Sequence, residues 1–381
     1  MVRCNPMSEE SQTKHGDTVY KKLAQRLDTI PNGFPATESG VELKLLAKLF
    51  TPEEAALALR LKLVPEYAER IAERTGDDPH TMEARLKSMA AKGLIRIKRG
   101  EKGPVFSLMP FVVGIYEMQV SRMDKELAQL FEDYYKEAFH KVMHSGPSIH
   151  RVIPVEQAVQ PGLEVLPYER ASEILNQAQS WGVLDCICRV QRKLLGKQCE
   201  HPIDICLVFS KKPNAYDKTN NIIKPLTKQE ALGVLRRAEE AGLVHTTGNH
   251  LGGLEYICNC CSCACAVLRG AAEFGILSIL APSAFRVSVD EKLCSGCELC
   301  LERCQFKALS VVDGMCKVEE RRCFGCGICV SSCEFGALSM TPRPADQVKP
   351  PPNSLADWMM ERAAVRGLDL DKLGEIIGKI P

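Results

Sequence analysis

The sequence predicts an α+β protein built from several domains. Its 381 residues are enough for two or three domains with cores of their own. Apolar residues recur at helical spacing through the first 145 residues, whereas later segments combine helical patterns with short strand-like runs. All cysteines except Cys4 follow residue 185. We therefore expect a helical N-terminal region, an α/β cysteine-rich middle, a small cysteine-rich module and a helical tail.

Composition and the first residues favour a cytoplasmic protein. The formal net charge of +1 argues against an affinity that rests on a broadly basic surface. Residues 1–6 lack the apolar core of a signal peptide, and no stretch reaches the length of a membrane span. In a reducing cytosol, thiols are metal ligands before they are disulfides. The nineteen cysteines therefore indicate bound metal.

Residues 1–39 are expected to form an N-terminal arm. Val19, Leu23, Leu27 and Ile30 lie at helical spacing, and a Pro-Asn-Gly turn ends the pattern. Such a stripe predicts one amphipathic helix that packs on the body of the protein.

Residues 40–110 predict three or four helices followed by a hairpin. Thr51 and the proline after it are an N-cap and a first helical position. The last helix is expected from Pro79 to Lys92, and two strands follow around a glycine-containing turn. This order resembles the winged-helix fold. The resemblance implies a recognition helix at 79–92 and a wing that carries Arg96, Lys98, Arg99 and Lys102.

Winged helices bind DNA or serve as docking modules. A DNA reader needs Arg, Asn or Gln near the front of the recognition helix, where these side chains reach base edges. Here Asp77 and Asp78 precede that helix and would repel phosphate, whose neutralisation dominates such affinity. DNA is therefore an unlikely partner.

Residues 111–145 predict one long connecting helix. Apolar side chains recur at three- and four-residue steps between Gly114 and Ser145, with no proline or glycine between them. Such a helix would be on the order of 45 Å long. Its stripe could pair with a second copy, which makes a homodimer possible. His140 and His144 share one face, but no acidic or cysteine ligand accompanies them, so we expect a solvated face.

Residues 146–285 predict an α/β domain with nine cysteines. Nine thiols this dense cannot all point into one apolar core, so metal ligation is expected. One set of four and a second run of five stand apart in the sequence. One or two [4Fe–4S] clusters are the first choice; a mixed site that draws on both groups, or zinc, is the alternative. Arg189 could hydrogen-bond a cluster sulfide. The cysteines are Cys186, Cys188, Cys199 and Cys206, then Cys258, Cys260, Cys261, Cys263 and Cys265.

Residues 286–341 contain the clearest motif, a C-x2-C-x2-C-x3-C run that occurs twice. The first run is Cys294, Cys297, Cys300 and Cys304, and the second is Cys323, Cys326, Cys329 and Cys333. Three thiols at two-residue steps on a curling loop can each meet a different iron. Strands are expected at 287–290, 309–312 and 338–340, and zinc is the alternative occupant.

These runs resemble the two-[4Fe–4S] module of bacterial-type ferredoxins. In that family the fourth cysteine of each run ligates the other cluster. The resemblance assigns one cluster to Cys294, Cys297, Cys300 and Cys333, and the other to Cys323, Cys326, Cys329 and Cys304. Where the family usually has proline after each last cysteine, this chain has Gln305 and Glu334.

The combination of motifs resembles ferredoxin-type proteins of strict anaerobes over most of the chain. The resemblance rests on the Cys-x-Cys-Arg motif at 186–189, the dense run at 258–265, the two-cluster module, and the arm from Leu23 to Leu59. It implies iron–sulfur cofactors and an anaerobic host, but no particular reaction.

Residues 342–381 predict a proline-rich linker and a helical tail. Two short amphipathic helices follow the linker, the first with Trp358 and Met359. Such a helix on a tether suits capture by a partner protein or packing back on its own body, and the sequence favours neither.

The motifs favour electron transfer over catalysis. We found no glycine-rich phosphate loop and no nucleophile constellation. The first hypothesis is a subunit or adaptor that relays electrons between a soluble donor and a partner oxidoreductase. The alternatives are an iron–sulfur redox- or oxygen-sensing transcription regulator that uses the winged helix, and an enzyme with an open iron in a central cluster.

Overall fold

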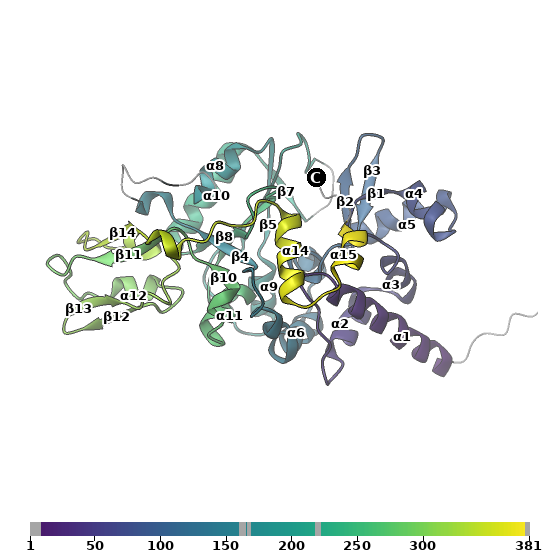
Figure 1. Cartoon of the computed structure of the whole chain (residues 1–381), viewed down its shortest axis with the longest axis horizontal. Coiled ribbons are helices and arrows are strands. Elements are labelled where there is room, and N and C mark those ends of the chain that lie inside the picture. Colours follow the sequence, from purple (N-terminus) through teal and green to yellow (C-terminus); the bar gives the residue numbers. More distant parts are fainter. Residues whose placement is uncertain (1–8, 160–164, 166–168, 218–221, 378–381) are drawn as a thin grey trace, which may run out of the picture. The chain divides into compact units, whose positions relative to one another are not determined.

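The computed structural model describes residues 9–159, 165, 169–217 and 222–377 of a mixed α+β, multidomain chain (Figure 1). It divides into two compact units. The first comprises residues 1–142 with 366–381, and the second comprises residues 143–365. Among the described residues, none of the helices combines the length and the apolar character that a membrane span requires.

The first unit begins with five helices. α1 packs against α2 and α3, and Leu23, Leu27 and Ile30 of the predicted stripe are buried. Thr51 caps α3 in a capping box, in which its side chain accepts from the Glu54 amide. The helices are α1 (Glu9–Asp28), α2 (Val41–Leu49), α3 (Pro52–Ala58), α4 (Ala68–Thr75) and α5 (Pro79–Ala91).

A three-stranded antiparallel sheet follows in the same unit, in the order β1-β3-β2. The predicted hairpin is present as β2 (Arg96–Arg99) and β3 (Pro104–Ser107), and β1 (Glu66–Tyr67) adds a strand that the sequence pattern did not indicate. Met82, Leu86 and Met89 of α5 are buried as the helical spacing predicts.

The single long helix predicted for residues 111–145 is wrong. Backbone angles at 112–114 are not helical, and a second break falls at Met123, which is extended. Asp124 then accepts a hydrogen bond from the Leu127 amide at 2.8 Å and starts a new helix. The segments are η1 (Phe111–Ile115), η2 (Glu117–Arg122), α6 (Lys125–Tyr134), η3 (Tyr135–Phe139) and α7 (His140–Val142).

The breaks let the apolar stripe fold on itself. Tyr116 stacks on Phe131 with ring centroids 3.7 Å apart, and Phe111 lies 4.6 Å from Phe34. Periodicity alone reports which residues are buried, and it cannot distinguish one helix from several short ones that share a core. Pairing of two copies through this segment is not tested by a single chain and stays a prediction.

The second unit is built on a seven-stranded sheet in the order β10-β4-β8-β9-β6-β5-β7. Neighbouring strands are antiparallel except β10 and β4, which are parallel. The strands are β4 (His150–Ile153), β5 (Ser180–Asp185), β6 (Asp204–Ser210), β7 (Lys224–Leu226), β8 (Val244–Gly248), β9 (Tyr256–Cys260) and β10 (Leu280–Ala281).

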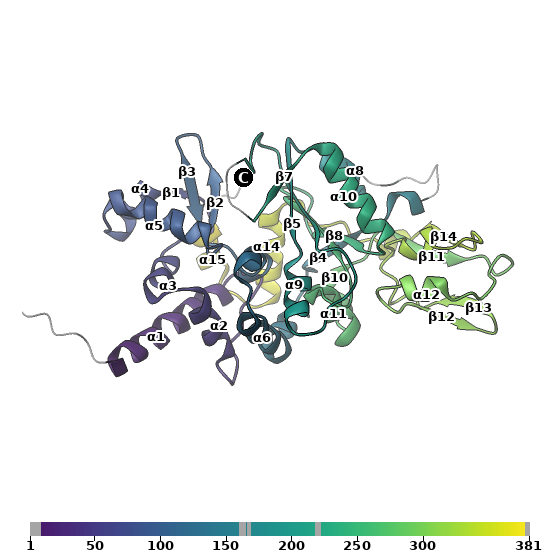
Figure 2. The ribbon, with the colours of Figure 1, turned by 180° about the vertical axis from the view of Figure 1, so that it is seen from behind.

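Four helices flank this sheet. Two of them, α8 and α10, lie side by side in both views (Figures 1 and 2). Thr227 starts α10 with a second capping box, and Ala231, Leu235 and Ala238 face the core as predicted. The helices are α8 (Ala171–Asn176), α9 (Ile187–Leu194), α10 (Lys228–Glu240) and α11 (Ala266–Glu273).

The C-terminal module of the second unit is a twofold repeat of loop, short helix and strand. β11 (Phe285–Val289) pairs with β14 (Leu338–Pro342), and β12 (Leu309–Val312) pairs with β13 (Met315–Val318), both antiparallel. The three predicted strands are confirmed, while β13 was not predicted. The two helices are α12 (Leu299–Arg303) and α13 (Ile328–Ser331).

The described part of the tail folds back on the chain. In the second unit, α14 (Leu355–Val365) buries Trp358, whose indole donates to the Ser148 carbonyl at 2.9 Å. Arg362 is fully buried there and donates to the Pro147 carbonyl at 2.9 Å. In the first unit, α15 (Leu370–Ile377) buries Leu373. Residues 378–381 lie outside the described part.

Two glycines of the C-terminal module test how closely its loops pack against neighbouring backbone. Gly325 and Gly336 both have positive φ, so alanine costs about 1–2 kcal/mol at either. A Cβ at Gly325 would also lie 2.0 Å from the Phe285 carbonyl oxygen, whereas a Cβ at Gly336 meets nothing within 4 Å. Gly325→Ala should therefore lose about 1–3 kcal/mol more than Gly336→Ala through overpacking. Anaerobic thermal bleaching of the visible absorbance measures the difference, and equal midpoints would contradict the packing.

Candidate metal centres

The eighteen cysteines of the described residues are all free thiols. They lie in the second unit, and seventeen of them form four groups: two in the C-terminal module and two in the central domain around the seven-stranded sheet. The remaining thiol, Cys316, adjoins the first group. We take the groups in turn.

The first group surrounds a pocket at the loop before α12. Cys294 and Cys297 come from this loop, Cys300 lies in the first turn of α12, and Cys333 follows α13. Cys297 is exposed, and so are two apolar neighbours in the lining, Leu299 at 41% and Phe335 at 53%. We call the segment 294–300 the first loop. Its three thiols and that of Cys333 lie beside an apolar, solvent-facing rim.

Cys316 is a fifth thiol in this pocket, and the sequence pattern did not single it out. Its Sγ lies 3.7 Å from Cys300 Sγ, and its amide donates to Cys294 Sγ at 3.3 Å. Burial and the charge of Cys300 raise the pKa of Cys316 to about 12. It is therefore a neutral thiol beside ligand candidates.

The second group collects Cys323, Cys326 and Cys329 with Cys304. Burial, then the charges of Cys304 and Cys323, raise the pKa of Cys326 to about 12. The Ala308 amide donates to Cys304 Sγ at 3.3 Å. We call the segment 323–329 the second loop. The charge of Cys304 is among the causes of the raised pKa of Cys326 and Cys329, which indicates that Cys304 lies near the second loop.

The central domain encloses the second loop. The Val155 amide donates to the Cys326 carbonyl at 2.9 Å, and Ser283 Oγ donates to the Gly325 carbonyl at 2.7 Å. Gly327 has a positive φ and lies so close to Ala158 that a Cβ would come within 2.7 Å of it. The two loops thus differ: the first faces solvent, and the second is sealed against the sheet domain.

The module brings the last cysteine of each run toward the other loop. Cys333 lies with the first loop and Cys304 with the second. The short helices explain this, because each run ends on a helix that leads away from its own loop. Ligation of the eight cysteines itself stays a prediction.

Six thiols of the central domain form a closed ring. Each interacts with the next, in the order Cys186, Cys188, Cys265, Cys260, Cys258, Cys206 and back to Cys186. We call this set the six-thiol ring. Hydrogen bonds from Cys188 and Cys206 hold the pKa of Cys186 well below its ordinary value, and those from Cys258 and Cys265 do the same for Cys260.

Strand pairing and helix starts build this ring. β6 and β9 pair with Leu207 opposite Ile257, which places Cys206 opposite Cys258. Cys258 and Cys260 share one face of β9 because side chains alternate along a strand. Cys186 and Cys265 are the N-cap residues of α9 and α11.

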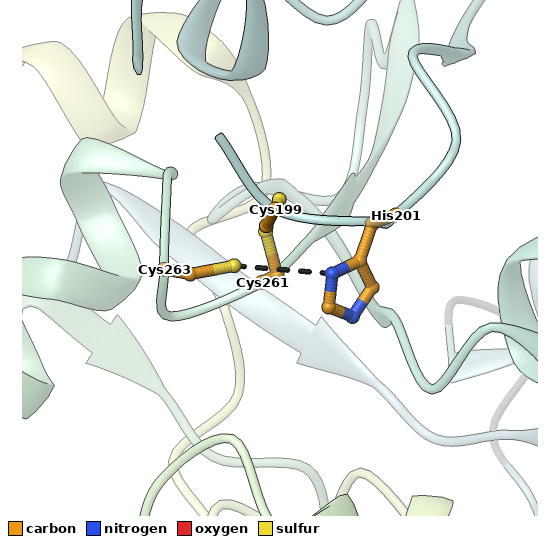
Figure 3. A group of neighbouring side chains, drawn as sticks. All are labelled: Cys199, His201, Cys261 and Cys263. Atoms are coloured by element: carbon orange, nitrogen blue, oxygen red, sulfur yellow. Dashed lines mark hydrogen bonds between the residues drawn. The ribbon is translucent and has the colours of Figure 1, made fainter. Parts of the chain in front are cut away.

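A separate group combines three thiols with a histidine. Cys199 and His201 come from the segment before β6, and Cys261 and Cys263 come from the loop after β9. The four side chains point toward one another (Figure 3), and their ligand atoms all lie within 4.8 Å. Cys199 Sγ is 4.0 Å from Cys261 Sγ, and Cys263 Sγ is 3.9 Å from His201 Nδ1. We call it the Cys3His group.

Arg189 is the charged neighbour of the Cys3His group. Its side chain is 3% exposed and donates to the Pro202 carbonyl at 3.0 Å, the Asn259 carbonyl at 2.9 Å and Cys261 Sγ at 3.4 Å. Hydrogen bonding from Cys263 and the charge of Arg189 lower the pKa of Cys261 to about 6, against the opposing effect of burial. The arginine therefore stabilises a thiolate, a role distinct from the predicted contact with a cluster sulfide.

Gln305 joins the module to the Cys3His group. Its Oε1 accepts from the Ser262 amide at 2.8 Å and from Ser262 Oγ at 3.0 Å, while its Nε2 donates to the Gly242 carbonyl at 3.1 Å. Ser262 stands between Cys261 and Cys263, and Gln305 follows Cys304. This contact accounts for the departure from proline at position 305: the amide side chain docks the module on the central domain.

The structure regroups the central cysteines. Cys199 lies against Cys261 and Cys263 rather than with Cys186, Cys188 and Cys206. Both groups draw on both sequence segments, as in the mixed alternative. The sequence analysis missed His201, although the Cys-x-His spacing at 199–201 and the Cys-x-Cys spacing at 261–263 were visible signals.

One family model matches the chain. Residues 317–339, which include the second loop and Cys333, match a 4Fe-4S binding domain. The chain matches no curated protein and no solved structure. The match supports an iron–sulfur, ferredoxin-type module with at least one [4Fe–4S] cluster.

Gln305→Ala tests the contact between module and central domain. The change leaves the Ser262 amide without its acceptor, which should cost about 1–3 kcal/mol. The matched control is Glu334→Ala, at the equivalent exposed position of the other run, where we expect a change within about 0.5 kcal/mol. Hydrogen exchange at the Ser262 amide should rise only in Gln305→Ala. Unchanged protection there would contradict the docking contact.

Proposed function

We propose that this protein is an iron–sulfur electron-transfer component that relays electrons between a soluble donor and a partner oxidoreductase. The proposal places one [4Fe–4S] cluster at each loop of the module, with the crossed ligands given above, and one in the six-thiol ring. When bound, such a cluster supplies one-electron transfer at a potential from about −700 to +450 mV. The matched 4Fe-4S binding domain and the crowded thiols support this proposal.

The thiols present fit this assignment. Four sulfurs from two segments surround the pocket of the first loop. The six-thiol ring offers more than the four thiolates that a cubane takes, and two of its members already have a lowered pKa. Amides at Cys316 and Ala308 donate to Cys294 and Cys304. Such hydrogen bonds stabilise the more negative, reduced state and raise the potential.

The observation that carries the proposal is the difference between the two loops. The first loop is open to solvent, and the second is held by the central domain through Val155, Ser283 and the Gln305 contact. A protein partner can reach the first loop, while the second is held against the central domain, where Gln305 next to Cys304 contacts Ser262. The chain thus has one outward-facing site and one inward-facing site, as a relay requires.

The rim of the first loop suits a transient redox partner. Leu293, Leu299, Val312 and Phe335 are four large apolar side chains exposed in the same module. Leu299 and Phe335 line the pocket itself. Scattered apolar residues need no explanation, but a cluster around a redox site favours a docking surface. Electron-transfer complexes bury less surface area than stable complexes. A patch of four apolar side chains suits a complex of that transient kind.

The proposal also includes the folds of two domains, one in the first unit and one at the end of the second. The order α3, β1, α4, α5, β2, β3 supports a winged-helix-like domain, and the twofold repeat of the module supports a ferredoxin-like one. We propose that the winged-helix-like domain is a docking module in a cytoplasmic protein. At the front of its α5, Asp77 pairs with Arg60 at 2.7 Å, and Arg85 lies 3.6 Å from the same carboxylate. An arginine engaged in this way is poorly placed to neutralise phosphate.

Ligand variants of the two loops test the relay. With a reduced ferredoxin as donor, Cys326→Ser with Cys329→Ser should leave the first-loop signal but slow reduction of the central signal, because the inward-facing ligands are gone. Anaerobic stopped-flow absorbance and freeze-quench EPR follow both. The matched control is Cys297→Ser with Cys300→Ser, which should slow reduction of every remaining signal. Central reduction at the wild-type rate without the second loop would refute the relay.

Phe335→Ala tests the docking rim. Truncation of an exposed aromatic anchor should raise the KM for a ferredoxin donor about tenfold, the equivalent of about 1.4 kcal/mol. Phe274→Ala is the matched control, because Phe274, the C-cap residue of α11, is 39% exposed and does not line the pocket. Steady-state reduction at varied donor concentration measures both. Equal effects of the two changes would exclude a docking role for this rim.

A further inference from the structure

The ligand atoms of the Cys3His group lie closer together than those of the other thiol groups among the described residues. It is the only group of three or more Cys, His, Asp or Glu among them whose ligand atoms all lie within 4.8 Å of one another. Neither four ferredoxin-type thiols nor the six-thiol ring meets this condition. The same chain therefore holds wide thiol groups and one narrow group.

The narrow spacing matches the ligands of a single ion. Zinc binds thiolate at about 2.3 Å and imidazole at about 2.0–2.1 Å. In a tetrahedron these bond lengths place two sulfurs about 3.8 Å apart, and a sulfur and a nitrogen about 3.5 Å apart. The observed separations are 4.0 Å between Cys199 and Cys261 and 3.9 Å between Cys263 and His201. A cubane instead puts each thiolate on a different iron, which spreads the sulfurs further.

The donor set also determines the metal class. Three thiolates and one imidazole are a closed, four-coordinate set of the kind found in structural zinc sites. Tetrahedral coordination by sulfur and nitrogen favours zinc over metals that prefer oxygen ligands. No fifth side chain is needed to complete the set, so this is a site that holds structure rather than one that binds substrate.

Charge balance supports the same occupant. One divalent ion with three thiolates has a formal charge of −1, and the buried guanidinium of Arg189 donates to Cys261 Sγ at 3.4 Å. Its other polar partners are the carbonyl oxygens of Pro202 and Asn259. A buried cation is costly unless paired. Thiolates held by a metal in this group supply negative charge to Arg189, in addition to the charge of Cys186 in the six-thiol ring.

We propose that Cys199, His201, Cys261 and Cys263 bind one zinc ion in a tetrahedral structural site, separate from the iron–sulfur ligands. The ion ties the segment before β6 to the loop after β9. Because Ser262 lies within that loop and donates to Gln305, the ion also fixes the surface on which the ferredoxin-type module docks.

Metal analysis of the full chain, purified without oxygen, tests the site. We expect about one zinc per chain, with a Zn K-edge spectrum of three sulfurs near 2.3 Å and one nitrogen near 2.0–2.1 Å. His201→Ala should lose zinc to a chelator with iron and sulfide unchanged, and His201→Cys should retain it. The matched control is Cys206→Ser, which should lower iron and sulfide and keep the zinc.

Two results would overturn the zinc assignment. One is wild-type protein without zinc, and the other is a loss of about four irons and four sulfides in Cys263→Ser. Should His201→Ala fail to fold, the wild-type spectrum and His201→Cys still decide the matter. The outcome is independent of the relay, because zinc can be present whether or not electrons pass through the module.

Discussion

Crowded, buried thiolates are stable only when positive charge compensates theirs. Seventeen cysteines of the second unit gather in four groups, several of them deeply buried beside one another. Burial, and then the charges of neighbouring cysteines, raise the pKa of members such as Cys326 and Cys329, so thiolates are unfavourable there without a metal. Metal or cluster binding is thus coupled to folding of this unit. Strand pairing and the positions of helix starts in this unit bring the sulfur atoms close enough together to share a metal or cluster.

Ordinary secondary structure achieves this gathering. Antiparallel pairing of β6 with β9 brings Cys206 opposite Cys258, and the starts of α9 and α11 supply Cys186 and Cys265. Left-handed Gly325 and Gly327 let the second loop pass close to Phe285 and Ala158. The module therefore contacts the central domain through its second loop, and the first loop remains exposed to solvent.

The structure of the C-terminal module could be predicted from the sequence more completely than that of the rest of the chain. Cysteine spacing and three short strands were predictable because each is specified within about ten residues. The grouping of Cys199 with Cys261 was not, since it depends on which strands pair across the sheet. The breaks at Val112 and Met123 were missed because a buried face keeps its period when a helix is interrupted. Gln305 stood out as a departure from proline, yet its partner Ser262 is 43 residues away.

The most direct test of the account is the iron and acid-labile sulfide content of the chain purified without oxygen. One cluster at each loop and one in the six-thiol ring predict roughly twelve irons and twelve sulfides per chain, at four of each per cubane. A content of roughly eight would leave the six-thiol ring without a cluster and end the proposed path into the central domain.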